Sequence, residues 1–502
     1  MRIEAELRPN RPSNAELRPE FADIGRVTRR LMTRTIGVAR AEDASAGRLI
    51  AGHFGTLETP PAVAKATWQA YDRVNVQIGV DAWLAEPGRT HTMTGLVDYR
   101  HRDLTLPDLM RPGRYSAGVG SVETEALPAG PGGMTLPCVQ IGLYLTSDAG
   151  ISDPGGLAVI LLRGPDQEHG SDQVHLEVAS TDQDRAQEIV AAIRRLSEKH
   201  NVFRGHVIEF GDEVFGYHRG SLLSFIDRPA VSRDEVILGD DVLDGIERQV
   251  LGVAKHAPRL LASGQHLRRG VLLYGVPGTG KTHTLRYLLS GLPGVTAVLL
   301  SGRALGMIGE ACSVARALQP CLIVVEDVDL IAEEREHYEG GSPLLFELLN
   351  EMDGIGQDID VTFLLTTNRA DMLEEALAAR PGRVDHAVEL PVPDAAARAR
   401  LIKLYQGNLE LELTDLPAVI ARTEGVTASF IKELLRRAAL AAAEADASAA
   451  DYSAPDDAPI RVTDEHMSAA LDQLLDTRSR LTQVLLGGKR RNHEPAELDQ
   501  LN

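Results

Sequence analysis

The stretch Gly275-Val276-Pro277-Gly278-Thr279-Gly280-Lys281-Thr282 decides the fold of this chain. It follows an apolar run, Gly270–Tyr274, that is typical of a buried strand, and it precedes a segment from His283 that is typical of a helix. Glycines allow the backbone to turn its N–H groups toward an anion, and a helix N-terminus adds a partial positive charge. The order strand, glycine loop, Lys-Thr and helix therefore predicts a nucleotide-phosphate site rather than a chance glycine-rich turn.

Within this predicted site, Lys281 would reach the β- and γ-phosphates, and the Thr282 hydroxyl would hold Mg²⁺. The remaining residues expected around the nucleotide belong to the loop and to the start of the helix: Gly275, Pro277, Gly278, Thr279, Gly280 and His283. The expected fold is α/β, with a parallel P-loop NTPase sheet and a helical lid, preceded by a mixed α/β N-terminal domain.

Length and composition bound the possible functions. A chain of 502 residues is too long for one core and predicts several domains. No run approaches the roughly 18 apolar residues that span a bilayer, and the first residues lack the apolar core of a secretory signal. The three cysteines have no metal-ligand spacing, so we expect a reduced, cytoplasmic protein without a membrane segment. The net charge of −20 disfavours nonspecific binding to nucleic acid.

The N-terminal half carries no catalytic pattern. Helical spacing of apolar residues, including Val63 and Trp68 after Pro60-Pro61, predicts a helical region over residues 1–86. From 87 to 230, short apolar runs between glycines and prolines predict a mixed α/β domain. Because this half lies beside the phosphate loop in the sequence, we expect it to bind a protein client or adaptor.

Two further apolar runs end in polar residues that suit phosphate chemistry. The run Cys321–Val325 delivers Glu326 and Asp327, so one carboxylate could steady Mg²⁺ and the next could polarise the attacking water. The run Val361–Thr367 ends at Asn368, whose amide could orient that water. A strand with an acidic cap, or a simple turn asparagine, is the alternative interpretation.

Two arginines follow the third run in a tight Pro-Gly turn. Arg380 and Arg383 flank Pro381-Gly382, and guanidinium groups bind phosphate oxygens well. If the two side chains point outward, they would reach the nucleotide of a neighbouring subunit. Surface arginines that form salt bridges are the alternative.

These motifs, in this order, resemble the AAA module of the AAA+ ATPases. The resemblance covers about residues 234–475 and also includes Leu-Leu-Asn-Glu-Met-Asp-Gly at Leu348–Gly354. It implies a ring, as a homo-hexamer, with ATP bound between subunits. The resemblance implies two sets of site residues. One set acts in cis, on the nucleotide of its own subunit: Lys281, Thr282, Glu326, Asp327 and Asn368. The other set, Arg380 and Arg383, acts in trans, on the nucleotide of a neighbouring subunit.

The same resemblance places Ile237 and Gly239 in the adenine pocket and Ala428 of the lid close to the nucleotide. It divides the rest of the chain into three segments: a large ATPase subdomain at 231–393, a helical lid at 394–475 and a flexible tail at 476–502.

Two departures from the common AAA pattern bear on function. The acidic pair is usually Asp then Glu, but here Glu326 precedes Asp327, so we expect slow hydrolysis. Threading relatives carry an aromatic residue in the first pore loop, where this chain has Met307, which can still grip a polypeptide. Tyr338 fits the second pore loop. Alternatively, Met307 packs in a core.

Three functions remain open from the sequence. The leading hypothesis is a ring ATPase that remodels, unfolds or disassembles proteins. The second is a slow nucleotide-dependent switch or scaffold that assembles with a partner without threading it. A nucleic-acid motor is disfavoured by the charge and by the AAA rather than helicase motifs.

Overall fold

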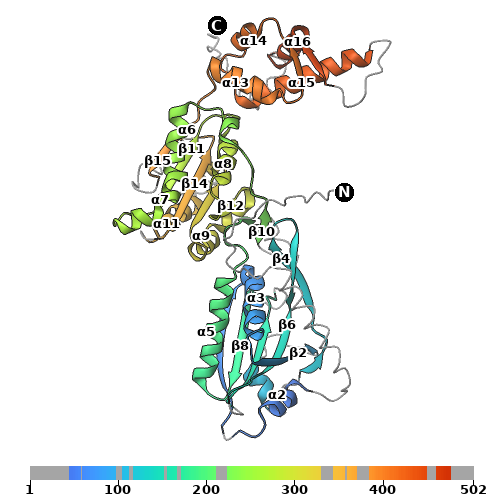
Figure 1. Cartoon of the computed structure of the whole chain (residues 1–502), viewed down its shortest axis with the longest axis vertical. Helices are drawn as coiled ribbons and strands as arrows, with labels where there is room; N and C mark the ends of the chain where they lie inside the picture. Colours follow the sequence, from blue (N-terminus) through green and yellow to red (C-terminus); the bar gives the residue numbers. More distant parts are fainter. Residues whose placement is uncertain are drawn as a thin grey trace, which may run out of the picture. The chain divides into compact units, whose positions relative to one another are not determined.

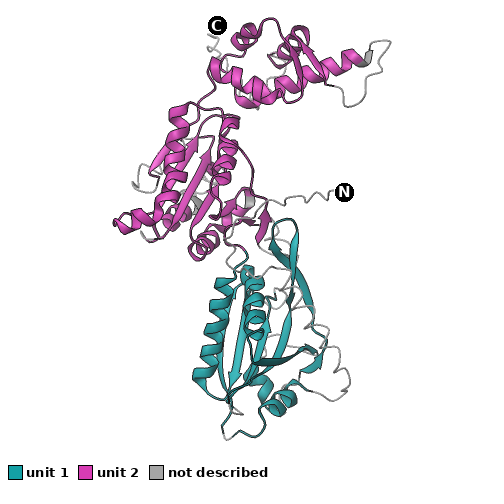
Figure 2. Ribbon diagram, in the orientation of Figure 1, with its two compact units in different colours: residues 1–202, 218–222 teal, residues 203–217, 223–502 magenta. Residues whose placement is uncertain are grey.

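The computed structural model describes residues 45–57, 59–97, 105–111, 117–151, 155–166, 171–210, 223–329, 343–354, 356, 359–369, 384–448 and 459–475. The chain divides into two compact units, residues 1–202 with 218–222 (unit 1) and residues 203–217 with 223–502 (unit 2; Figure 2). The first 44 residues of the predicted helical region and the predicted tail, 476–502, lie outside the described residues.

Unit 1 is built on a six-stranded antiparallel sheet with the strand order β1-β8-β7-β6-β2-β3. The strands of this sheet and of a separate hairpin, β4-β5, are β1 (Ala62–Gln69), β2 (Arg89–Val97), β3 (Gly118–Gly120), β4 (Thr124–Gly130), β5 (Met134–Val139), β6 (Ile141–Asp148), β7 (Leu157–Arg163) and β8 (Gln173–Ser180). The helices are α2 (Ala46–Phe54), α3 (Arg73–Leu84), α4 (Leu106–Met110) and α5 (Gln183–Lys199).

Each face of this sheet buries its own hydrophobic cluster. The helices α3 and α5 lie on one face (Figure 1). They contribute Val76, Val80 and Ile189 to a core with Trp68 and Tyr144. On the other face, α2 and α4 contribute residues such as Ile50, Phe54 and Leu106. The sheet therefore forms the middle layer of unit 1.

The prediction of a helix directly after Pro60-Pro61 is wrong for residues 62–69. Residues 62–69 form β1, in which Ala64, Ala66 and Trp68 are buried and alternate with exposed residues. This period of two is the strand pattern, and long-range pairing with β8 overrides the helical propensity of alanine and lysine. Because β1 lies in one sheet with β6, β7 and β8, the expected segments 1–86 and 87–230 share one unit.

Unit 2 contains a seven-stranded sheet with the order β10-β9-β12-β13-β14-β11-β15. The strands are β9 (Val207–Phe210), β10 (Leu223–Ile226), β11 (Arg269–Tyr274), β12 (Thr296–Leu300), β13 (Cys321–Val325), β14 (Val361–Thr367) and β15 (His386–Glu389). The helical elements are α6 (Asp240–Glu247), the π-helix η6 (Arg248–Gly252), α7 (Val253–Ala262), α8 (Lys281–Ser290), the 3-10 helix η7 (Gly302–Met307), α9 (Ile308–Ala317) and α11 (Pro343–Gly354). All neighbours pair in parallel except β9 and β10.

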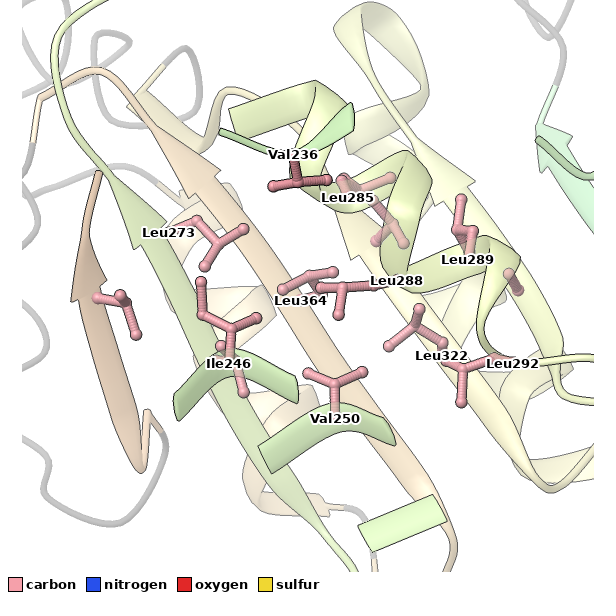
Figure 3. Close-up of a cluster of buried hydrophobic side chains, with 14 of the residues drawn as sticks. Val236, Ile246, Val250, Leu273, Leu285, Leu288, Leu289, Leu292, Leu322 and Leu364 are labelled. Atoms are coloured by element: carbon pink, nitrogen blue, oxygen red, sulfur yellow. The ribbon is translucent and has the colours of Figure 1, made fainter. Parts of the chain in front are cut away.

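The core of this sheet explains why the apolar runs recognised in the sequence are continuous. Leu273 of β11, Leu322 of β13 and Leu364 of β14 are buried against Leu288 of α8 and Ile246 of α6 (Figure 3). Parallel strands covered by helices on both faces are apolar at nearly every position. The predicted P-loop NTPase sheet, with a mixed α/β region before it, is confirmed.

The hairpin β9-β10 extends this sheet beyond the segment that the sequence assigned to it. β9 pairs with β12, and Arg228 donates hydrogen bonds of 2.7 Å to the carbonyls of Leu289 and Val295. Residues 203–210 and 223–230, which the sequence placed in an N-terminal domain, therefore belong to unit 2.

The C-terminal part of unit 2 is helical, as predicted. It contains α13 (Ala395–Tyr405), α14 (Leu416–Arg422), α15 (Ala428–Ser448), α16 (Asp464–Leu475) and a small parallel pair, β16 (Glu410–Glu412) and β17 (Arg461–Thr463). These elements enclose a core of their own that includes Phe430, Leu434 and Leu471. Among the described helices, none combines the length and the apolar character that a membrane crossing requires.

Candidate nucleotide-binding site

The strand order brings three sequence motifs to one edge of the sheet. β14 lies between β11 and β13, and all three strands run in parallel. Their C-terminal ends are followed by the glycine loop, by Glu326 and Asp327, and by Asn368. Ligands of open α/β sheets bind at this edge.

The glycine loop adopts a conformation that other residues would strain. Gly278 and Gly280 have φ of 85° and 101°, which is the left-handed region. A Cβ on Gly275 would lie 2.4 Å from the carbonyl oxygen of Leu390. The hydroxyl of Thr279 donates to the carbonyl oxygen of Val276 at 3.0 Å and closes the loop, with Pro277 exposed at its crown. Gly280 then caps α8 at Lys281.

Lys281 is buried at the base of this loop. Its Nζ donates to the carbonyl oxygens of Gly275 at 2.8 Å and Val276 at 3.1 Å. Burial lowers the pKa of Lys281, and the carboxylates of Asp327 and Asp329 act in the opposite direction. The ammonium group is thus held where anionic oxygens can replace the two carbonyl acceptors.

Thr282 and Glu326 contact each other directly. The Thr282 hydroxyl donates to Glu326 Oε2 at 3.0 Å, although β11 and β13 are separated by β14. A hydroxyl and a carboxylate are hard oxygen ligands, and protein Mg²⁺ sites commonly use one or two such ligands together with substrate phosphates and water. These two residues therefore fit an Mg²⁺ ion. Among the described residues, no cluster of three His, Cys, Asp or Glu side chains could hold a metal.

Asp327 and Asn368 form the second contact across the strands. The Asn368 amide Nδ2 donates to Asp327 Oδ1 at 3.1 Å. Asp327 has φ of 53°, and it is the non-glycine residue with positive φ in the described part of the chain. Its backbone N–H donates to Thr366 Oγ1 at 3.1 Å. A non-glycine residue in this region is uncommon and often marks a functional site.

The structure adds a residue to which the sequence assigned no role. Asp329 is buried, and its Oδ1 accepts hydrogen bonds from the Thr367 hydroxyl at 2.9 Å and from the Asn368 backbone N–H at 3.1 Å. The available signal was a third acidic residue two positions after Asp327, which the sequence alone could not distinguish from a helix cap.

The residues predicted around the adenine lie on a segment that is fixed to the site. His283 contacts the carbonyl oxygen of Glu235 through Nε2 at 3.0 Å, which holds the chain before Ile237 against α8. Ile237 packs against the lid core, to whose edge Ala428 also contributes, and Gly239 begins α6. The next lid residue, Ser429, donates its N–H to the carbonyl oxygen of Gly278 at 3.2 Å. The lid helix α15 therefore starts directly at the glycine loop.

The other four predicted residues are those expected to contact a neighbouring subunit or a threaded chain. Arg380, Arg383 and Tyr338 lie outside the described residues. Met307 is half-buried at the end of η7, immediately before α9. Its predicted contact with a threaded chain stays a prediction.

The sheet order and the loop that caps α8 define a P-loop nucleoside triphosphatase. Residues 271–392 match the family described as "ATPase family associated with various cellular activities (AAA)". The chain thus carries an AAA+ ATPase module, and the predicted resemblance is confirmed.

Several known proteins are similar to part of this chain. An ATP-dependent zinc metalloprotease FtsH 2 of Symbiobacterium thermophilum is 33% identical over 242 residues, 45% of this chain and 41% of that protein. A human ATPase family gene 2 protein homolog A is 34% identical over 45% of this chain and 26% of its own length. A proteasome-activating nucleotidase of Thermococcus onnurineus is 29% identical over 53% of this chain and 67% of its own. The matched part of the chain thus spans less than half of the metalloprotease and of the human protein.

Proposed function

We propose that this chain binds ATP with Mg²⁺, hydrolyses it, and uses the cycle to remodel, unfold or disassemble proteins as a ring, with six copies as the expected number. The observation that supports hydrolysis is the meeting of Lys281, the Thr282–Glu326 pair and the Asp327–Asn368 pair at one sheet edge. Together they offer what phosphoryl transfer to water requires: Lys281 is a cation for the phosphates, the first pair supplies oxygen ligands for a metal, and the second pair supplies a base held in place.

The proposed steps use these side chains in turn. Lys281 would bind the β- and γ-phosphates in place of the loop carbonyls that it contacts. Bound Mg²⁺ would supply positive charge against the phosphate oxygens, held by Thr282 and Glu326. Water would attack the γ-phosphorus while its proton passes to Asp327, which Asn368 orients, and ADP would leave.

The remaining roles concern neighbours and partners. Arg380 and Arg383 would reach the γ-phosphate of an adjoining subunit, so that turnover depends on assembly. Unit 1 would bind the client or adaptor. The three cysteines are free and buried, which suits the reduced, cytoplasmic location that we propose.

The names of two relatives, a metalloprotease and a proteasome-activating nucleotidase, support action on proteins rather than nucleic acid. The second candidate is a slow switch or scaffold. It is favoured by Met307, because a half-buried methionine replaces the aromatic residue of threading relatives.

One experiment separates these functions. ATP turnover is measured against protein concentration, with Lys281→Met as the inactive control, and fluorescent casein is the model client. We expect turnover per subunit to rise as the protein assembles. If Met307→Ala keeps turnover and loses casein unfolding, the ring threads polypeptide; if the unaltered protein turns over ATP and never unfolds casein, the switch is favoured. Absence of any turnover at assembled concentrations would contradict the proposed hydrolysis.

A further inference from the structure

We propose that Asp329 and Thr366 are positioning residues for ATP hydrolysis, which fix Asn368 and Asp327 relative to each other. The proposal rests on the proposed hydrolysis, because Asp329 and Thr366 would act through Asp327, the candidate base of that reaction. Neither residue needs to contact the nucleotide.

The first part of the argument concerns the end of β14. Asp329 lies after β13, and its single oxygen Oδ1 accepts from both the Thr367 hydroxyl and the Asn368 backbone. Because β13 and β14 are adjacent, these two bonds fasten the end of one strand to the turn after the other. Asp329 and Thr367 are both buried, so water competes little for these hydrogen bonds. The backbone from which the Asn368 amide projects is thereby fixed.

The second part concerns the backbone of Asp327. Thr366 Oγ1 accepts the Asp327 N–H and holds this residue at φ of 53°. Asp and Asn enter the left-handed region more readily than longer side chains, because their short polar groups bond locally. The order Glu326 then Asp327 therefore suits this backbone, since the shorter acid occupies the strained position.

The two parts meet at the Asn368–Asp327 hydrogen bond of 3.1 Å. An aspartate reaches one methylene less far than a glutamate, so a base of this length has little freedom to correct its own position. Loss of either anchor would shift the base or its amide partner, and small misplacements of reacting groups reduce rates strongly.

The test compares substitutions that remove or keep the hydrogen-bond acceptor. Asp329→Ala and Thr366→Val should lower kcat for ATP about tenfold to a hundredfold, with KM changed less than about threefold. Asp329→Asn keeps an Oδ1 acceptor and should restore most of the lost turnover. Thr362→Val is the matched control, because Thr362 lies on the same face of β14 and far from its C-terminal end.

Two outcomes would overturn this inference in a protein that hydrolyses ATP. One is an unchanged kcat in Asp329→Ala; the other is an Asp329→Asn variant as slow as Asp329→Ala. A protein without turnover would instead contradict the proposed function.

The anchor is also tested without ATP, by thermal unfolding of Asp329→Ala, Thr367→Val and the double variant. We expect the double variant to lose no more in Tm than Asp329→Ala, because Asp329→Ala already removes the hydrogen bond that Thr367→Val removes. Additive losses would overturn the inference whether or not ATP is hydrolysed.

Discussion

The Thr282 hydroxyl and the Glu326 carboxylate lie 3.0 Å apart, although the strands that carry them are not neighbours. The bond crosses over the end of β14 and joins the first turn of α8 to the turn after β13. The binding of an ion by these two oxygens would therefore depend on both motifs. The contribution of each residue can be tested by its own substitution.

Glu326→Gln should weaken the response to Mg²⁺. The amide keeps the size of the side chain and loses its charge, and Mg²⁺ is a hard cation that proteins bind through carboxylate oxygens. We expect the Mg²⁺ concentration for half-maximal ATP turnover to rise about tenfold or more. Glu351→Gln is the control, because Glu351 pairs with Arg316 on α9. An unchanged Mg²⁺ requirement would remove Glu326 from the metal site.

Asp327→Asn should abolish most of the turnover and spare binding. Asparagine tolerates the same left-handed backbone but cannot accept a proton, and a general base contributes about a hundredfold or more. The measurement is ATP hydrolysis beside binding of a fluorescent ATP analogue. Asp360→Asn, just before the other end of β14, should have little effect. Turnover that survived Asp327→Asn would mean that another group is the base.

Gly278→Ala should separate the lid from the glycine loop. A Cβ there would lie 2.8 Å from Ser429 Oγ and 2.9 Å from Thr427 Oγ1, at φ of 85°. Strain of this kind costs about 1 to 3 kcal/mol. We expect a lower Tm for unit 2 and weaker binding of the ATP analogue. Gly264→Ala has a similar φ of 72° with open space around it, so it isolates the backbone strain. Equal losses in both variants would argue against the lid contact.

Unit 1 should become less stable as the pH rises toward neutrality. Burial raises the pKa of Asp81 from 3.8 to about 7, and Gln77 partly opposes this through a 2.9 Å hydrogen bond. The folded state therefore keeps a proton that the unfolded chain loses above about pH 4. The contribution of Asp81 to the free energy of unfolding is therefore greatest at lower pH. As the pH rises, this contribution falls by at most about 1.4 kcal/mol per pH unit until the folded carboxyl ionises near pH 7.

Thermal unfolding between pH 4.5 and 8 measures this slope. Asp81→Asn should flatten it without abolishing it, since burial also raises the pKa of Asp72 to about 6. Asp182→Asn is the control, because Asp182 is an exposed residue that caps α5 in the same unit. A slope that Asp81→Asn leaves unchanged would show that Asp81 is not the group responsible.

Much of the site was predictable from the sequence because its polar residues lie in short, recognisable motifs. Lys281, Thr282, Glu326, Asp327 and Asn368 follow strands that the sequence marks by apolar runs. Parallel strands then bring their ends together at one edge, as the contacts between these residues bear out.

The rest depends on contacts that no local pattern encodes. β1 contains alanine and lysine, which favour helices, and only pairing with β8 makes it a strand. The left-handed backbone of Asp327 is held by Thr366, a residue 39 positions later. The role of Asp329 likewise depends on Thr367 and could not be read from an acidic turn.

The hairpin β9-β10 has a practical consequence for anyone who wishes to study the ATPase alone. A fragment that starts at residue 231 would leave the parallel strand β12 with bare N–H and C=O groups along one side, which invite other chains to pair with it. It would also lose Arg228, which donates hydrogen bonds to the carbonyl oxygens of Leu289 and Val295. Such a fragment should aggregate, whereas one that starts at residue 203 retains the strands that seal the sheet.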